Sequence, residues 1–539
     1  MNVAVLHNQT HPDWYWTTTN ASEAIPGVLT PLGWTLWGPC GEKAMRRVFH
    51  KIGGLPVSAL PMPTDPRDLI INVFFGRIAI NVDTFVRIGN AMPGARGVDL
   101  ARQMLGYVPD ELPTDTAWRR YPVVLAKFPP AFLRMPARAR TLCEQTETWY
   151  RSVIDSADRL DPAGARALFR DARARFDDAV YVQTLTTTTG IQPIFQQLTA
   201  LAERAGVDAS TLMVGHGSHA ESQLVQDLWD CSRGRLPLDD VVARHGFHGP
   251  GEGHVSGTVW RQDPGPLRRV LETYRAMPDD RDPARESARR TVERGDAERR
   301  LLAAQPAWQR PASRLVLRLA ERYLPLRGGC KAAFLQSLDV CRATAARIGE
   351  LLVTDGVLAE VDDVYYLTCD ELLGRLPDDP ATTVKARRAE RERYLELDLP
   401  VAWRGDPEPL AAAAPAPATT RFSGTGVSGG QATGPARVVL DPSDVDMEIG
   451  DVLVARTTDP SWASVMYPAA ALVVEVGGQL SHAAVVAREL GIPCVMGVPD
   501  ATVGIRDGER IRVDGSAGTV EVLERSASGT SIDTGPAAR

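Results

Sequence analysis

The stretch GGQLSHAAVVARELGIPCVMGV, residues 477–498, contains a single histidine, His482, directly after Ser481 and before an apolar run. Ser481 is a good N-cap residue, so we expect a short helix over residues 483–490. His482 then lies in the first helical turn, where the dipole and the backbone N–H groups keep the imidazole neutral and attract a phosphoryl group. A neutral imidazole that attacks phosphorus forms a phosphoramidate, which passes its phosphoryl group readily to a second acceptor. The pattern therefore predicts a phosphoryl carrier, but it is also typical of a histidine that only caps a helix.

Two further pairs of residues could act on a phosphoryl group. Arg327 and Lys331 are four positions apart, so on a helix they share one face and could hold an anion between them. The loop sequence HGFHGPGEGH contains His248 and Glu252, which are candidate groups for general acid–base catalysis. A structural interpretation stays open for both pairs: solvent-exposed helix charges for the first and a glycine-rich loop for the second.

Histidines recur between residues 216 and 254, and they allow an alternative interpretation as a metal site. Imidazole and carboxylate ligands suit zinc or iron, so such a cluster would make the protein a metal-dependent hydrolase. The histidines concerned are His216, His219, His245, His248 and His254. Neither HxxH pair lies on a convincing helix and both lie among glycines, so we expect no metal ligands in this chain.

The elements that must position these residues are of two kinds. Residues 1–404 place apolar side chains at helical spacing, which predicts a mainly α-helical domain. Residues 422–525 contain short β-branched segments such as ARVVL and DVLVAR, with one helix among them, which predicts a small strand-rich domain. An Ala/Pro-rich linker over residues 405–421 joins the two, and residues 526–539 form a polar tail that we expect to be disordered. The chain is therefore multidomain.

Two other features of the sequence need a structural interpretation. The first forty residues carry an aromatic cluster that is more typical of a core than of a ligand site, although aromatic pockets do bind organic molecules. Its members are Trp14, Tyr15, Trp16, Trp34 and Trp37. A GxGxxG match at residues 424–429 follows a linker and leads into a strand, so it does not fit a dinucleotide-binding loop and predicts a turn instead.

Composition excludes several classes of protein. The 539 residues have a formal net charge of -7, which disfavours nucleic-acid binding. The seven cysteines are scattered and form no CxxC pair, so a disulfide framework or structural zinc site is not expected. No apolar run reaches the roughly 18 residues of a membrane span, and the N-terminus does not have the pattern of a signal peptide. We expect a cytoplasmic protein.

The sequence around His482 resembles the phosphohistidine motif of the phosphoenolpyruvate-utilising, or swivelling histidine-domain, family. The family pattern is Gly-Gly, two residues, Thr or Ser, His, Ala or Gly, then a helix ending in Arg-Glu-x-Gly-Ile-Pro. The matching positions are Gly477, Gly478, Ser481, His482, Ala483, Arg488, Glu489, Gly491, Ile492 and Pro493. The resemblance spans residues 422–524. It implies a β/β/α swivelling domain in which His482 carries the phosphoryl group beside Ser481 and the glycine pair.

Residues 14–404 resemble, more diffusely, the acceptor-binding domain of the rifampin phosphotransferases in that family. The segments HGFHGPGEGHVSGTVWRQDP, residues 245–264, and RYLPLRGGCKAAFLQSLDVCR, residues 322–342, carry this resemblance. It implies that Arg327 and Lys331 lie beside the acceptor hydroxyl. Relatives commonly have an acidic residue after the arginine, where this chain has Gly328, so the general base is not assigned.

The resemblance also implies how His482 is loaded. Relatives that use ATP carry an ATP-grasp module ahead of these domains, and relatives that use phosphoenolpyruvate carry a barrel after them. We recognise neither here, nor the Gly-Lys pair of a P-loop. We therefore expect a separate ATP-grasp protein, like the N-terminal part of pyruvate phosphate dikinase, to phosphorylate His482 with ATP and Mg²⁺.

The acceptor is expected to be a hydroxyl of a small, fairly apolar molecule. The phosphoester is either the final product or a leaving group for a later step such as elimination, which would make the reaction a net dehydration. The alternative is a non-enzymatic phosphocarrier that relays the phosphoryl group between proteins.

Overall fold

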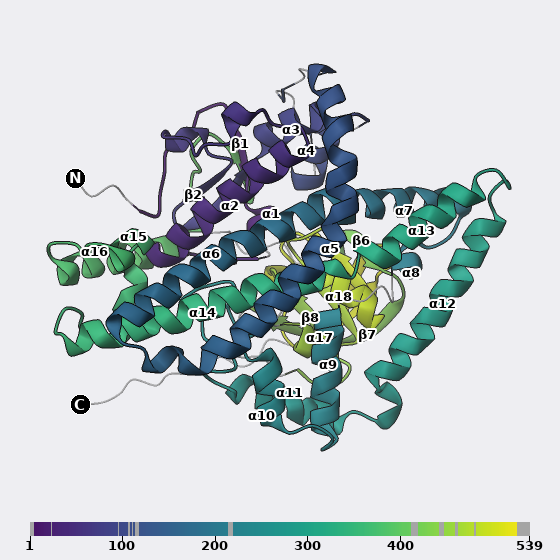
Figure 1. Cartoon of the computed structure of the whole chain (residues 1–539). Helices are drawn as coiled ribbons and strands as arrows, with labels where there is room; N and C mark the ends of the chain where they lie inside the picture. The colour runs from purple at the N-terminus through teal and green to yellow at the C-terminus, as the bar shows by residue number, and fades with distance from the viewer. Residues whose placement is uncertain are drawn as a thin grey trace. The chain divides into compact units, whose positions relative to one another are not determined.

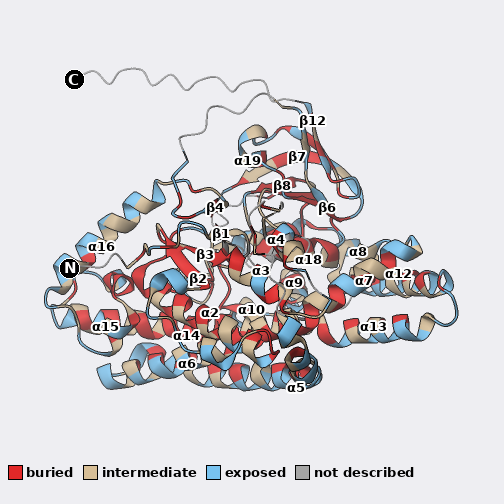
Figure 2. Cartoon of the chain, turned by 90° about the horizontal axis from the view of Figure 1, so that it is seen from above, coloured by how far each residue is buried: buried red, intermediate tan, exposed pale blue. Residues whose placement is uncertain are grey.

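Three long helices that pack side by side form the centre of the helical part of the chain: α5 (Tyr121–Val153), α6 (Pro162–Thr186) and α14 (Leu326–Thr354) (Figure 1). Nearly every residue of α14 between Ala333 and Ala345 is buried. A helix that is buried on all sides must lie inside a larger helical assembly. The outer helices α12 (Pro283–Ala303) and α16 (Pro380–Leu395) are largely exposed or half-buried (Figure 2).

The structure is a computed structural model. It describes residues 5–22, 24–94, 96–105, 108–109, 112–113, 118–213, 219–410, 419–440, 447–458, 462–478 and 481–524. The chain folds as two compact units, residues 1–413 with 459–464 and residues 414–458 with 465–539. Most of the expected linker, residues 411–418, and the expected tail, residues 526–539, lie outside the described residues. None of the described helices is long and apolar enough to cross a membrane.

The remaining helices of the first unit are shorter. They are α1 (Thr19–Ser22), α2 (Pro31–Lys51), α3 (Val82–Asn90), α4 (Gly97–Leu105), α7 (Gln192–Ala205), α8 (Ala209–Met213), α9 (His219–Ser232), α10 (Leu238–His245), α11 (Gly265–Ala276), α13 (Arg310–Tyr323) and α15 (Cys369–Leu373). The mainly helical character expected of residues 1–404 is confirmed.

The first unit also contains a small sheet that the helical pattern did not predict. Its strand order is β2-β3-β1-β4, with β1 (Tyr15–Thr17), β2 (Ile71–Phe74), β3 (Arg77–Asn81) and β4 (Ala402–Arg404). Strands this short leave too little alternation for a sequence pattern to detect. Because β4 pairs with β1, the sheet joins the two ends of the unit.

The aromatic cluster at the N-terminus is largely core. Trp16 is fully buried and packs with Phe74 and Trp403 in the small sheet. Trp34 and Trp37 on α2 are also buried. The core interpretation of these three tryptophans is therefore confirmed, and they do not line an exposed entrance.

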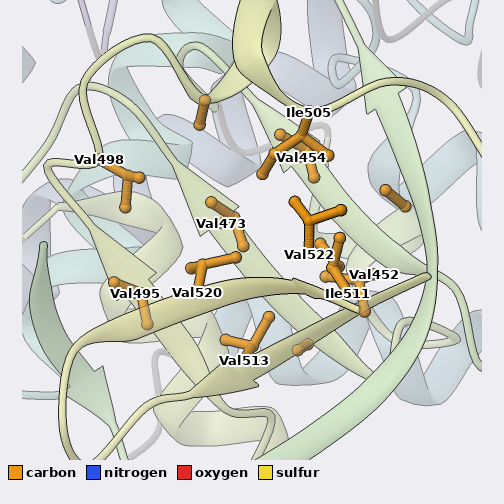
Figure 3. Close-up of a cluster of buried hydrophobic side chains, with 13 residues drawn as sticks. Val452, Val454, Val473, Val495, Val498, Ile505, Ile511, Val513, Val520 and Val522 are labelled. Carbon is orange, nitrogen blue, oxygen red and sulfur yellow. The ribbon is translucent and has the colours of Figure 1, made fainter. Parts of the chain in front are cut away.

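The second unit is a curled sheet of eight strands in the order β5-β12-β11-β7-β8-β9-β10-β6. The strands are β5 (Arg421–Ser423), β6 (Thr425–Ser428), β7 (Gln431–Val439), β8 (Val452–Ala455), β9 (Ala471–Val474), β10 (Cys494–Met496), β11 (Arg510–Asp514) and β12 (Thr519–Glu524). The strands β5 and β6 at the two ends of this order are nearly continuous in sequence, so the sheet must curl round to bring its edges together. Figure 3 shows the valine-rich core, including Val454, Val473 and Val513, that fills the curl.

Three details of the second unit differ from expectation. The GxGxxG match forms strand β6 and not a turn. The short helix α19 (Ala501–Gly504) accompanies the expected helix α18 (His482–Leu490), and a second short helix, α17 (Ala463–Met466), spans the division between the two units at residues 464 and 465. Single helical turns of four residues carry too little periodicity to predict.

Asp339, in the middle of α14, is the most heavily bonded buried charge of the first unit's centre. It accepts hydrogen bonds from the hydroxyl of Tyr150 on α5 at 2.8 Å, from Arg261 at 3.0 Å and from Arg342 at 2.8 Å. Burial alone would raise the pKa of Asp339, but the two guanidinium groups outweigh burial and hold that pKa below its ordinary value. Arg342 also donates to the carbonyl oxygens of Glu252 and His254. One carboxylate therefore ties α5, α14 and the loop after α10 together.

We predict that Asp339→Asn destabilises the first unit by about 3–5 kcal/mol, because it leaves Arg261 and Arg342 buried without their counter-charge. All eleven tryptophans fall in the first unit, so tryptophan fluorescence during urea unfolding reports on it selectively. The depressed native pKa means that this stabilisation is complete above the unfolded-state pKa and is lost only as pH falls through the native one. The difference in free energy of unfolding between wild type and Asp339→Asn should therefore persist at pH 5 and disappear in strong acid.

Glu350→Gln is the matched control, since Glu350 lies on the exposed end of the same helix and, among the residues that the structure describes, its carboxylate pairs only with Arg347. We expect it to change stability by less than about 0.5 kcal/mol. Equal unfolding midpoints for the two variants would contradict the role assigned to Asp339.

Candidate functional site

The helix that begins at His482 has the ends that the sequence predicts. Ser481 is the N-cap, and its Oγ accepts a hydrogen bond from the N–H of Ala484 at 3.2 Å. Gly491 ends α18 in the left-handed conformation with φ 65°. His482 is therefore the first residue of α18, at the positive end of the helix dipole. Its side chain lies outside the described part of the structure.

Neighbouring strands anchor the start of α18. The Ser481 hydroxyl also contacts Sδ of Met496 on β10 at 2.9 Å, and Ser481 is buried. Arg488, buried on the same helix, donates from Nε to the carbonyl oxygen of Val427 on β6 at 2.8 Å. Two residues of the motif thus fix α18 to neighbouring strands, and this fixes the position of the His482 backbone.

The glycine pair before the helix has two different roles. Gly477 has φ 147°, and a Cβ there would collide with Cε of Met496. Gly478 is exposed, and a Cβ there would meet nothing within 4 Å. The carbonyl oxygen of Gly478 accepts a hydrogen bond from the N–H of Ser481 at 2.9 Å, which closes the turn into α18. Gly477 is therefore required by packing, whereas Gly478 leaves the approach to the helix start open.

Arg327 and Lys331 lie on the first two turns of α14, both half-buried. Four residues apart on one helix, they face the same side, as the sequence predicts. Gly328, the residue after Arg327, is buried. Cations at the start of a helix oppose the dipole, so an anion held there would be attracted by both the side chains and the helix.

An aromatic ladder joins α5 to the end of α13, the helix that precedes the basic pair in the chain. Phe128 and Phe132 on α5 stack at 6.1 Å between ring centroids, and Phe132 stacks on Tyr323 at 4.5 Å. Tyr323 ends α13, one turn before Arg327, and its hydroxyl donates to the carbonyl oxygen of Phe132 at 3.0 Å. Phe128 and Phe132 are half-buried, so they offer partly accessible apolar surface on α5.

A π-helical turn, Thr187–Ile191, separates α6 from α7 and adjoins the ladder. Pro193 follows it and cannot donate to the helical ladder, which explains the local widening. A Cβ on Gly190 would meet Cδ1 of Tyr323 at 2.7 Å, so this glycine permits the close contact. Neither the ladder nor the π turn was predicted, because both depend on contacts between segments far apart in sequence.

His248 and Glu252 form a buried pair at a different place. Nδ1 of His248 lies 2.7 Å from Oε2 of Glu252, and both residues are buried. The backbone of Glu252 is held by Arg342. At about 1.5 Å of rise per residue, Arg342 lies roughly 16 Å along α14 from Lys331. The two predicted pairs are therefore anchored at separate positions along α14, and the local contacts of His248 and Glu252 are those of a braced loop.

The other candidate metal ligands, where their side chains are described, each contact a different partner. Nε2 of His245, the last residue of α10, lies 2.9 Å from Oδ2 of Asp227, and Nε2 of His254 lies 2.5 Å from the carbonyl oxygen of Pro26. Burial lowers the pKa of His245 and lowers that of His254 to about 4. Among the described residues no group of three His, Cys, Asp or Glu side chains could hold a metal ion. His216 and the side chain of His219 lie outside the described residues.

Comparison with known proteins assigns the two regions that carry the candidate residues. Residues 447–518 match the family "PEP-utilising enzyme, mobile domain", and residues 193–328 match "Rifampicin phosphotransferase fourth domain". His482 lies inside the first match and Arg327 at the end of the second. The resemblance inferred from the sequence is thereby confirmed.

Several relatives share about half of this chain. The rifampicin phosphotransferase of Streptomyces sviceus is 35% identical over 54% of this chain and 34% of its own length. That of Bacillus subtilis is 30% identical over 54% of this chain and 35% of its own. An uncharacterized protein of Mycobacterium tuberculosis is 35% identical over 52% of this chain and 30% of its own. The chain thus spans about a third of the length of these relatives.

The glycine pair gives a direct test of how the start of α18 is built. We predict that Gly477→Ala destabilises the second unit by about 1–3 kcal/mol, because it combines strained backbone with a clash against Met496. Gly478→Ala, one residue away in open space, should cost less than about 0.5 kcal/mol. Hydrogen-exchange mass spectrometry of peptides from β9, α18 and β10 measures both, and faster exchange in the Gly478 variant than in the Gly477 variant would refute the assignment.

Proposed function

We propose that this protein is the phosphocarrier and acceptor component of an ATP-dependent phosphotransferase. The proposal starts from the matches to the mobile domain of PEP-utilising enzymes and to the fourth domain of rifampicin phosphotransferase. His482 is the carrier. The observation that supports this most strongly is the capped helix start at Ser481–His482 inside the matched mobile domain. The names of the relatives support a phosphotransferase activity for the pair of domains.

In the loading step, the neutral imidazole of His482 attacks a phosphorus atom of ATP. The N–P bond forms as the P–O bond to the leaving nucleotide breaks, and the phosphoryl group stays on His482. We assign ATP and Mg²⁺ to a separate ATP-grasp protein, because neither matched region is an ATP-binding module. The residues of this chain then supply the helix start, Ser481 and the open approach at Gly478, where backbone N–H groups and the dipole favour a phosphoryl group.

In the delivery step, the hydroxyl oxygen of an acceptor attacks the phosphorus atom. The N–P bond breaks, the imidazole is released neutral, and the hydroxyl proton passes to a base. Arg327 and Lys331 balance the negative charge of the moving phosphoryl group, which is the main requirement of such a transition state. Gly328 supplies no side chain for the base, so the base stays unassigned, and the buried positions of His248 and Glu252 make a bracing role the simpler one for them.

The acceptor we propose is a small, fairly apolar molecule with a free hydroxyl. With Trp16, Trp34 and Trp37 in the core, this assignment depends on the half-buried rings of Phe128 and Phe132, which stack toward Tyr323, one turn before Arg327. Rifampicin, which the names of two relatives contain, is the natural first compound to try. Whether the phosphoester is the product or is eliminated in a later step is read from the products of the same reaction.

We predict that the chain, incubated with an ATP-grasp protein, Mg²⁺ and radiolabelled ATP, acquires acid-labile, base-stable phosphate, and that His482→Ala abolishes it. Arg327→Ala and Lys331→Ala should load normally but pass the label to an acceptor roughly 10²–10³-fold more slowly, the range found when one transition-state charge partner is removed. Arg322→Ala, which removes an exposed arginine of α13, is the charge control and should match wild type.

The outcomes separate the alternatives. Full labelling of His482→Ala would end the proposal. A panel of hydroxyl compounds that includes rifampicin tests for a small-molecule acceptor. If none of them accepts the label and phospho-His482 passes it only to another protein, the result would favour the non-enzymatic phosphocarrier. Accumulation of a dehydrated product with free phosphate would identify the phosphoester as a leaving group.

A further inference from the structure

Two thiols meet where α5 packs against the start of α14. Sγ of Cys143, on α5, lies against the α14 backbone at Gly329, and Cys330 is the next residue of α14. A Cβ on Gly329 would lie 3.2 Å from Sγ of Cys143, so the glycine lets the thiol approach the α14 backbone. Sγ of Cys330 also lies 3.9 Å from Oγ1 of Thr186 on α6. Three helices thus converge on this pair.

The two sulfurs differ in the way that a reactive pair requires. Cys143 is the one cysteine that is half-buried, whereas Cys330 and the other five are buried. Interaction with the neighbouring Cys330 thiol lowers the pKa of Cys143, and interaction with Cys143 together with burial raises the pKa of Cys330. A partly accessible thiol stabilised as thiolate attacks oxidants, and a neighbouring buried thiol resolves the product.

The other five cysteines lack the features that would make a thiol reactive. All seven lie in the described residues and all are free. Burial raises the pKa of each of the remaining thiols, namely Cys40, Cys231, Cys341, Cys369 and Cys494. Such thiols are inert toward oxidants. Reactivity is therefore concentrated at Cys143.

The position of the pair relates it to the basic residues. Cys330 immediately precedes Lys331, and Gly329 and Gly328 separate it from Arg327. A disulfide holds two sulfurs at about 2 Å, closer than two unbonded thiols can stand. Closing the bond therefore pulls on the same turn of α14 that presents Arg327 and Lys331. Two glycines in that turn make its backbone easier to displace.

We infer that Cys143 and Cys330 are an oxidation site, at which a peroxide forms a reversible disulfide that displaces the basic pair. The thiolate of Cys143 attacks one oxygen of hydrogen peroxide, the O–O bond breaks, and a sulfenic acid and hydroxide form. The thiol of Cys330 then attacks the sulfenic sulfur, the S–S bond forms, and the hydroxyl leaves as water after taking the thiol proton. Two thiols and one peroxide give one disulfide and two waters. A dithiol reductant reverses the reaction.

Peptide mapping of the full chain tests the site directly. After treatment with hydrogen peroxide and blocking with N-ethylmaleimide, we expect two of the seven cysteines to lose reactivity and a Cys143–Cys330 cross-link to appear. In Cys330→Ser the reaction should stop at a sulfenic acid on Cys143, which dimedone traps. In Cys143→Ser both effects should vanish, whereas Cys231→Ser should cross-link like wild type. Absence of the cross-link in wild type, or its survival in either Cys143→Ser or Cys330→Ser, overturns the inference.

The consequence for activity depends on the proposed function. Cross-linked protein should still be loaded at His482 but should release its phosphoryl group to an acceptor several-fold more slowly, and dithiothreitol should restore the rate. Unchanged release from fully cross-linked protein would overturn the effect on the basic pair. Failure of His482 to load in reduced protein would count against the proposed function alone, since the cross-link is measured without it.

Discussion

The hydrogen bond from the N–H of Ala484 to the hydroxyl of Ser481 is the interaction on which the proposed chemistry depends. It fixes where α18 begins and so makes His482 the first residue of the helix. A histidine one turn later would lose both the dipole and the outward-pointing N–H groups. Met496 contacts the cap, and Arg488 of α18 donates to Val427 on β6, so the sheet holds the helix start and the backbone of His482 in place.

In the first unit the corresponding constraint is the burial of α14. Its centre is fixed by Asp339 and Arg342, which also brace the loop of His248 and Glu252. Its start is less constrained, because two adjacent glycines lie between Arg327 and Cys330. The centre of α14 is therefore held rigidly, while its first turns, which carry Arg327 and Lys331, can shift when the neighbouring cysteines are oxidised.

Sequence reasoning succeeded where the determinants are local. The limits of α18 follow from Ser481, Gly491 and Pro493, and the shared face of Arg327 and Lys331 follows from helical spacing. It failed where distant segments meet. The sheet that joins Tyr15–Thr17 to Ala402–Arg404, the stacking of Phe132 on Tyr323 and the separate anchoring of the Glu252 loop all depend on tertiary contacts. The strand formed by residues 425–428 was missed because its glycines favour a turn until the neighbouring strand β10 is present.

The central claim is that His482 carries a phosphoryl group through a nitrogen–phosphorus bond. Phosphorus NMR of the full chain after loading by an ATP-grasp protein, combined with mass-spectrometric localisation under neutral conditions, tests it most directly. The account predicts one phosphoramidate resonance that maps to His482 and vanishes in mild acid. A phosphate ester on neighbouring Ser481, or a resonance that maps to any other residue, would contradict it.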